Sequence, residues 1–186
     1  MKKGNKLKFV LILILFSIIF IGFNFKSVEK FFYPRRYSGY VERYSKEYNI
    51  DENLVYSVIK AESKFIPDAQ SHKGAKGLMQ ISDTTAKWAE KEIGIDSKKI
   101  FEPETNIKTG CWYLSRLYKE FGKKDLVIAA YNGGSGNVRR WLEDEEYSKD
   151  GVNLHDIPFE ETLKYVDKVN KNYSMYNKIY CGKEAK

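Results

Sequence analysis

Hydrophobic residues recur at intervals of three and four along most of the chain, and this spacing predicts helices rather than strands. Glycine and proline fall between the periodic stretches, where they separate one helix from the next. Residues 63–80 hold Pro67, Gly74 and Gly77, so we expect an irregular connection there with room for a short hairpin. The pattern predicts an all-α fold with little or no β-structure, an irregular helical bundle with helices at 37–48, 51–62, 84–94, 104–121, 125–131, 138–142 and 159–180.

The second and the last of these helices have the clearest apolar faces. The second begins at Asp51, a good N-cap, and its inward stripe ends at Glu62. That stripe consists of Leu54, Val55, Val58 and Ile59. On the last helix we expect the inward positions to be Leu163, Val166, Val169, Tyr173 and Tyr176.

A different pattern marks the N-terminus, where 17 uncharged, mostly apolar residues run from Phe9 to Phe25 after four lysines. This length is at the lower limit for a transmembrane helix, and no convincing small-residue cleavage site follows it. We therefore expect an uncleaved single-pass anchor in the cell membrane, with a secreted form as the alternative. The lysines keep the N-terminus in the cytoplasm, which puts the remainder outside. The expected divisions are a basic N-terminus (1–8), the anchor (9–25), a linker (26–36) and one domain (37–186).

The net charge of +7 invites a nucleic-acid interpretation, but the location of that charge disfavours one. The first 36 residues hold eight basic residues and one acidic residue, whereas the remainder holds 24 of each sign. A neutral domain lacks the basic excess that phosphate binding needs, so we expect no nucleic-acid partner.

Few residues here suit a metal or cofactor. The chain has two histidines, His72 and His155, and its cysteines Cys111 and Cys181 are too far apart in sequence for a zinc finger. Nucleophile-elbow and phosphate-loop motifs are missing as well. We expect no metal and no cofactor. An exported domain permits a disulfide between the two cysteines, but the sequence leaves their pairing open.

Glu62 is the candidate for acid–base chemistry. It emerges from the same helix face as the buried stripe, so its carboxyl group is expected to be partly desolvated. Desolvation raises the pKa of a carboxyl group, which is what a general acid needs to remain protonated near neutral pH. A structural carboxylate at the last turn of an amphipathic helix is the alternative interpretation.

Four segments resemble, in order and spacing, the motifs of the soluble lytic transglycosylase family of lysozyme-like domains: AES (61–63), SHKGAKGLMQ (71–80), AAYNGG (129–134) and ETLKYV (161–166). The resemblance implies a lysozyme-like fold with a substrate cleft, the glycan strands of peptidoglycan as substrate, and a 1,6-anhydro-N-acetylmuramic acid product. It implies that Glu62 is the catalytic acid. The substrate-binding residues that it implies are Ser63, which helps to orient that carboxyl group, Gly77, Leu78, Met79, Gln80, Tyr131, Asn132 and Tyr165.

Two alternatives to this activity remain open from the sequence. The first is a hydrolytic muramidase of the same fold, in which Asp68 or Asp83 positions a water molecule. The second is a non-catalytic glycan-binding scaffold of the cell envelope. Protein partners and the physiological role are not indicated by any motif.

Overall fold

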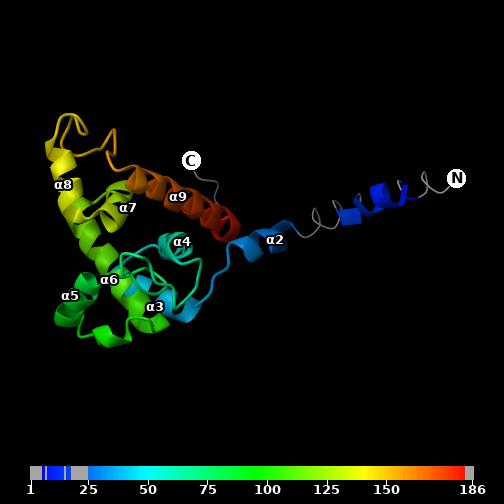
Figure 1. Cartoon of the computed structure of the whole chain (residues 1–186), viewed down its shortest axis with the longest axis horizontal. Coiled ribbons are helices and arrows are strands. Elements are labelled where there is room, and N and C mark those ends of the chain that lie inside the picture. The colour runs from blue at the N-terminus through cyan, green and yellow to red at the C-terminus, as the bar shows by residue number, and fades with distance from the viewer. Residues whose placement is uncertain (1–5, 7, 15, 18–24, 183–186) are drawn as a thin grey trace. The chain divides into compact units, whose positions relative to one another are not determined.

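The computed structural model describes Lys6 and residues 8–14, 16–17 and 25–182 (Figure 1). The chain divides into two compact units, the first ending at Arg35 and the second beginning at Arg36. In the first unit, α2 covers Phe25–Phe32. Within the described residues, no helix combines the length and apolar character that crossing a bilayer requires. The expected anchor at 9–25 lies partly outside the described residues, since Leu15 and residues 18–24 are not among them.

The second unit is a bundle of helices, and its elements follow the hydrophobic pattern closely. Within the described residues it contains no β-strand, only two isolated bridges that join Gln70 to Lys76 and Lys76 to Ile81. The prediction of an all-α fold is confirmed. The helices are α3 (Ser38–Tyr48), α4 (Glu52–Glu62), α5 (Asp83–Ile93), α6 (Pro103–Phe121), α7 (Lys124–Gly133), α8 (Ser135–Glu143) and α9 (Glu160–Tyr176), with a short 3₁₀ turn η1 (Ser97–Lys99) and a π-helical turn η2 (Asn177–Cys181).

Polar caps fix the starts of the helices that border the site. The Asp51 carboxylate accepts a hydrogen bond from the backbone N–H of Asn53 at 2.7 Å and begins α4. The hydroxyl group of Ser82 accepts one from the backbone N–H of Thr85 at 3.1 Å and begins α5. Each cap satisfies a backbone donor that the first turn of a helix leaves unpaired.

The core lies where α4 meets α9 and where α6 meets α3 and α7 (Figure 1). Helix α4 is itself buried over most of its length, since every residue from Asn53 to Ile59 is withdrawn from solvent. The last residue of this helix, Glu62, therefore lies at the edge of the packed core. Helix α9 packs against α4.

The face of α9 differs from the expected one. Val166, Val169 and Tyr176 are buried as predicted, but Leu163 is 41% exposed and Tyr173 is only half-buried. The rotation of α9 is set by what it packs against, α4 and α7, and this places Thr162 and Tyr165 on the inward side. Two polar contacts of these residues, described below, therefore replace the apolar contact predicted for Leu163.

The two cysteines are free thiols, which answers the question that the sequence left open. Cys111 is fully buried on α6, whereas Cys181 is exposed at the end of η2. Burial raises the pKa of the Cys111 thiol far above its ordinary range, so it packs as a small apolar residue.

Candidate active site

Glu62 occupies the last position of α4, where its carboxyl group is largely withdrawn from water. Burial is the main cause that raises the pKa of Glu62 to about 7. A nearby Glu161 charge acts in the same direction, while a Tyr165 hydrogen bond and the Lys168 charge act against it. A carboxyl group whose pKa lies near neutral pH can both give and take a proton.

Tyr165, on α9, is the direct partner of this carboxyl group. Its hydroxyl group donates a hydrogen bond to Oε1 of Glu62 at 2.7 Å, and its side chain is only 7% exposed. One turn further along α9, the ammonium group of Lys168 donates to the backbone carbonyl of Ala61 at 2.5 Å. The end of α4 is thus tied to α9 at two adjacent residues, which fixes the direction in which Glu62 points.

Glu161 brings a second carboxylate into the electrostatic surroundings of Glu62. It is exposed at the start of α9 and forms an ion pair with Lys73 of the loop 63–82, with 2.9 Å between Nζ and Oε2. The acidic residues considered from the sequence lie in other settings: Asp68 is exposed, and Asp83 is exposed and paired with Lys76 at 2.6 Å.

The backbone of the GLMQ segment is held by Asn106, a fully buried residue of α6. Its amide oxygen accepts the backbone N–H of Met79 at 2.7 Å, and its amide nitrogen donates to the carbonyls of Lys76 at 2.9 Å and Ile100 at 2.7 Å. Gly77 packs directly on this amide with a φ of +75°, and a Cβ there would lie 2.3 Å from Nδ2 of Asn106. Only glycine fits both the left-handed backbone and the close approach.

The side chains of this segment pack within the domain or bond to the loop itself. Leu78 and Met79 are fully buried, and the sulfur of Met79 packs on the backbone of Gly110 in α6. Gln80 has a left-handed backbone, with φ of 49°, and its amide donates to the carbonyls of Ala69 and Gly77. The resemblance implied that Met79 and Gln80 line the sugar groove. In the structure the Gln80 amide bonds to the loop, and the carbonyl oxygen of Met79 accepts the hydroxyl group of Tyr131; their place in the sugar groove stays a prediction.

Tyr131 of α7 reaches that carbonyl oxygen, donating its hydroxyl group to Met79 at 2.9 Å. Burial is the main cause that raises the pKa of Tyr131 well above its ordinary value, and the charge of Glu62 adds to it, so the phenol lies within electrostatic reach of that carboxyl group. The residue that follows, Asn132, accepts a hydrogen bond from the hydroxyl group of Thr162 at 2.9 Å through its amide oxygen. With its oxygen engaged, Asn132 has an amide N–H₂ to offer to a ligand.

The hydroxyl group of Ser63 bonds to backbone groups at the end of α4. Its hydroxyl group donates to the carbonyl of Ile59 at 3.2 Å and accepts the backbone N–H of Phe65 at 3.1 Å. These bonds turn the chain as it leaves α4, and this turn includes two residues with left-handed backbones, Lys64 and Phe65. Ser63 therefore stabilises the turn by which the chain leaves the helix, and its expected role in orienting the carboxyl group stays a prediction.

Four residues around the site were not identified from the sequence: Asn106, Glu161, Thr162 and Lys168. The sequence did contain one indication of the role of Asn106. It is a polar residue on the inward face of a helix, one position before Ile107 and one turn before Gly110. Glu161, Thr162 and Lys168 flank Tyr165 on α9, and only the rotation of that helix brings them to the site. Within the described residues, no group of three metal-binding side chains is present.

Three comparisons relate this chain to known proteins. Residues 39–153 match the family model described as the transglycosylase SLT domain. The soluble lytic murein transglycosylase of Salmonella typhimurium is 35% identical over 159 residues, covering 82% of this chain and 25% of that protein. Membrane-bound lytic murein transglycosylase C of Cronobacter sakazakii is 31% identical over 173 residues, covering 77% of this chain and 47% of that protein.

The fold is similar as well to that of a solved structure, the 70-kDa soluble lytic transglycosylase of Escherichia coli. The two superpose with a TM-score of 0.72 at 30% sequence identity, over 84% of this chain and 26% of that one. The chain thus spans between a quarter and half of the length of the relatives that it matches.

Proposed function

Because the chain belongs to the transglycosylase SLT domain family, we propose that it is a lytic transglycosylase, which cleaves the β-1,4 bond between N-acetylmuramic acid and N-acetylglucosamine in peptidoglycan without consuming water. The observation that carries this proposal is a single carboxyl group, Glu62, with a pKa of about 7 and a hydrogen bond from Tyr165. Relatives named as murein transglycosylases support the choice of substrate.

In the proposed reaction, protonated Glu62 gives its proton to the glycosidic oxygen, and the bond between that oxygen and C1 of the muramic residue breaks. The carbonyl oxygen of the muramic 2-acetamido group stabilises the positive charge that develops on C1. The carboxylate of Glu62 then takes the proton of the C6 hydroxyl group as that oxygen bonds to C1. The 1,6-anhydro ring is formed, and the proton is back on Glu62, so the cycle needs no second carboxyl group.

The neighbours of Glu62 have matching tasks in this scheme. The hydroxyl group of Tyr165 stabilises the carboxylate that forms after the first proton transfer, because a hydrogen bond to the charged form is stronger than one to the neutral form. The amide N–H₂ of Asn132 is suited to hold the acetamido group of the substrate. Tyr131 holds the carbonyl of Met79 and so fixes the GLMQ backbone.

Product analysis tests this function directly. Purified peptidoglycan is digested with the full chain, and the released fragments are examined by mass spectrometry. A transglycosylase leaves muramic ends that weigh one water less than the reducing ends left by a hydrolase, so reducing ends alone would contradict the proposal and favour a muramidase. The Glu62→Gln variant should bind the polymer without cleaving it, and unchanged cleavage by that variant would contradict the role of Glu62.

The proposal extends to the location of the protein. We propose that residues 9–25 anchor it in the cell membrane once, with residues 1–8 in the cytoplasm and the domain from residue 37 onward outside, joined by the linker 26–36. The apolar stretch after four lysines supports this arrangement, and so does the similarity to a relative named as membrane-bound. N-terminal sequencing of the protein from membrane and soluble fractions tests it, since a chain found only in the soluble fraction and starting near residue 26 would contradict an anchor.

A further inference from the structure

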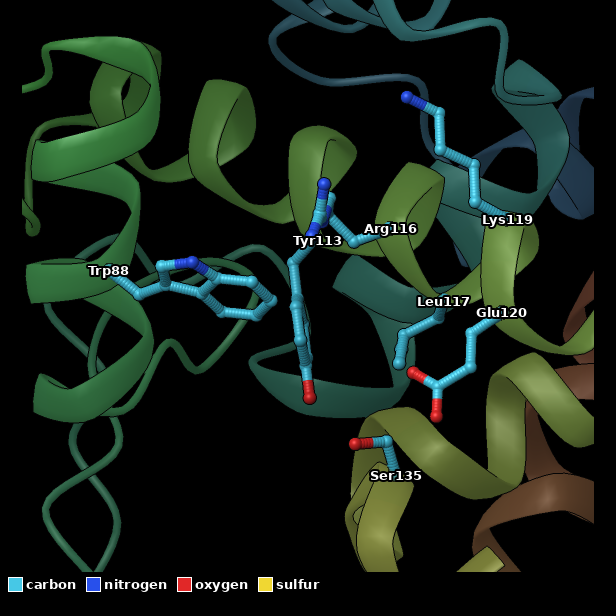
Figure 2. A pocket seen from close by; sticks show the side chains of 7 residues that line it. All are labelled: Trp88, Tyr113, Arg116, Leu117, Lys119, Glu120 and Ser135. Carbon is cyan, nitrogen blue, oxygen red and sulfur yellow. The ribbon is translucent and has the colours of Figure 1, made fainter. Parts of the chain in front are cut away.

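A pocket of about 260 Å³ opens on the flank of α6, where α5 and the start of α8 approach it (Figure 2). None of its residues was considered from the sequence as part of a site. Their side chains combine aromatic rings, two cations, a carboxylate and a hydroxyl group. They are Trp88, Tyr113, Arg116, Leu117, Lys119, Glu120 and Ser135.

Aromatic rings connect this pocket with the site around Glu62. The rings of Trp88 and Tyr113 stand nearly perpendicular, with centroids 6.3 Å apart and an angle of 75° (Figure 2). Tyr113 in turn contacts Tyr131, with 5.4 Å between centroids. Because Tyr131 lies within electrostatic reach of Glu62, these rings link the pocket with the site on its α5 side.

Trp88 is held in place although it is 37% exposed. The buried indole of Trp112 meets it edge-on, with centroids 4.8 Å apart, and fixes it from the core side. The guanidinium group of Arg116 lies over the Trp88 ring at 5.3 Å from its centroid. Such stacking uses the face of a guanidinium group and leaves its N–H groups directed outward in the plane.

The charges of the pocket leave Arg116 without a protein acceptor. On the opposite wall, the Glu120 carboxylate is already paired with Arg139 of α8, with 2.7 Å between Nε and Oε1. In the part of the chain that the structure describes, Arg116 has neither an ion pair nor a hydrogen bond. Lys119 extends away from Glu120 and Ser135 (Figure 2). One oriented cation with unused donors therefore faces the pocket, and its natural ligand is a carboxylate.

We propose that this pocket binds a carboxylate of the stem peptide carried by a muramic residue of the strand, with Arg116 as its partner and Trp88 and Tyr113 as the apolar wall. The inference rests on the proposed function, because peptidoglycan is the polymer whose sugars carry such peptides. A bare sugar ring has no charge, so it offers no anionic partner to the guanidinium group of Arg116. The pocket thereby selects strands that still bear their peptides.

Binding without turnover tests this proposal. The full chain carrying Glu62→Gln is titrated by calorimetry with two tetrasaccharides whose stem peptides are identical, except that the carboxylates are free in one and amidated in the other. Adding Arg116→Met, which keeps a long apolar side chain over Trp88, should weaken binding of the free carboxylate substrate by about tenfold. It should leave the Kd of the amidated substrate unchanged. Arg116→Lys should restore part of the loss.

Lys87→Met is the matched control, because Lys87 is an exposed cation that precedes Trp88 on α5 and does not line the pocket. It should affect neither substrate. Equal weakening of both substrates by Arg116→Met, or no change in either, overturns the proposal, as does a parent variant that binds neither tetrasaccharide. The proposed function fails by a different result, the absence of anhydro ends after digestion with the unsubstituted chain.

Discussion

The hydroxyl group of Tyr165 lies 2.7 Å from Oε1 of Glu62, although 103 residues separate the two along the chain. This contact opposes the effect of burial on the same carboxyl group, since it favours the charged form that burial disfavours. The balance holds the pKa of Glu62 at about 7 instead of higher. A general acid that must also act as the base needs this intermediate value.

Removing the hydroxyl group of Tyr165 should leave burial unopposed and raise the pKa of Glu62. In Tyr165→Phe, the pKa of Glu62 rises further, and kcat falls by about tenfold to a hundredfold because the carboxylate loses its donor after the first proton transfer. The pH dependence of kcat measures both effects. Tyr173→Phe is the control, because Tyr173 lies on the same helix and bonds a different carboxylate, that of Asp51, at 2.7 Å. A shifted pH profile in that control would show that the change is not specific to the site.

Two charges on α9 should move the same pKa in opposite directions. Replacing Glu161 by Gln removes a negative charge and lowers the pKa of Glu62, whereas replacing Lys168 by Met removes a positive charge and raises it. Both side chains are exposed, so salt should reduce both shifts. The measurement is a carbon-13 NMR titration of the Glu62 carboxyl group in each variant. Shifts of the same sign in the two variants would contradict the electrostatic explanation.

The raised pKa of Glu62 also has a stability cost at high pH. The folded chain holds a proton on Glu62 up to about pH 7, while the unfolded chain releases it near 4.5, so this group lowers the free energy of unfolding as pH rises from 4.5 to 7. Relative to low pH, Glu62 lowers the free energy of unfolding by about 3 kcal/mol at pH 8 and above. Glu62→Gln should therefore be more stable than the parent at pH 8 and nearly equal to it at pH 4. Denaturant unfolding at the two pH values measures this, and an equal difference at both would be contrary to the prediction.

The close packing around the GLMQ segment predicts a contrast between two glycines. Gly77→Ala puts a methyl group on a left-handed backbone and against Asn106, which three hydrogen bonds hold in place, so we expect a loss of about 3 kcal/mol. Gly110→Ala meets the flexible end of the Met79 side chain within a regular helix, and the loss should be smaller. Chemical denaturation of the two variants measures the difference, and a Gly110→Ala loss equal to or greater than that of Gly77→Ala would refute this account.

The helices and their ends could be predicted because the signals are local. Asp51 begins its helix as predicted, and the ranges expected at 84–94 and 104–121 end close to Gly94 and Gly122, which cap those helices in the structure. The buried setting of Glu62 could be predicted for the same reason, since its place at the end of an apolar stripe depends on its own helix alone, whereas its assignment as the catalytic acid came from the family resemblance. Its partner Tyr165 came from the family resemblance.

What the sequence did not provide depends on how helices meet. Leu163 was expected inside because its spacing fits, but two hydrogen-bonding neighbours, Thr162 and Tyr165, take the inward positions of α9. Lys168 reaches the backbone of Ala61 only through this rotation. Asn106 accepts the N–H of Met79, which lies 27 residues earlier in the chain. The residues around Asn106 do not indicate which loop its side-chain amide will bind.

The distance along the chain between Glu62 and Tyr165 also determines when the site can exist. A chain made from its N-terminus presents α4 early, and the hydroxyl group of Tyr165 arrives only after α5 to α8 and the first turns of α9 have been synthesised. Contacts of such long sequence separation form late. Prematurely terminated products that stop before α9 would contain the acid without its partner, and the proposed chemistry would be confined to molecules that have finished folding.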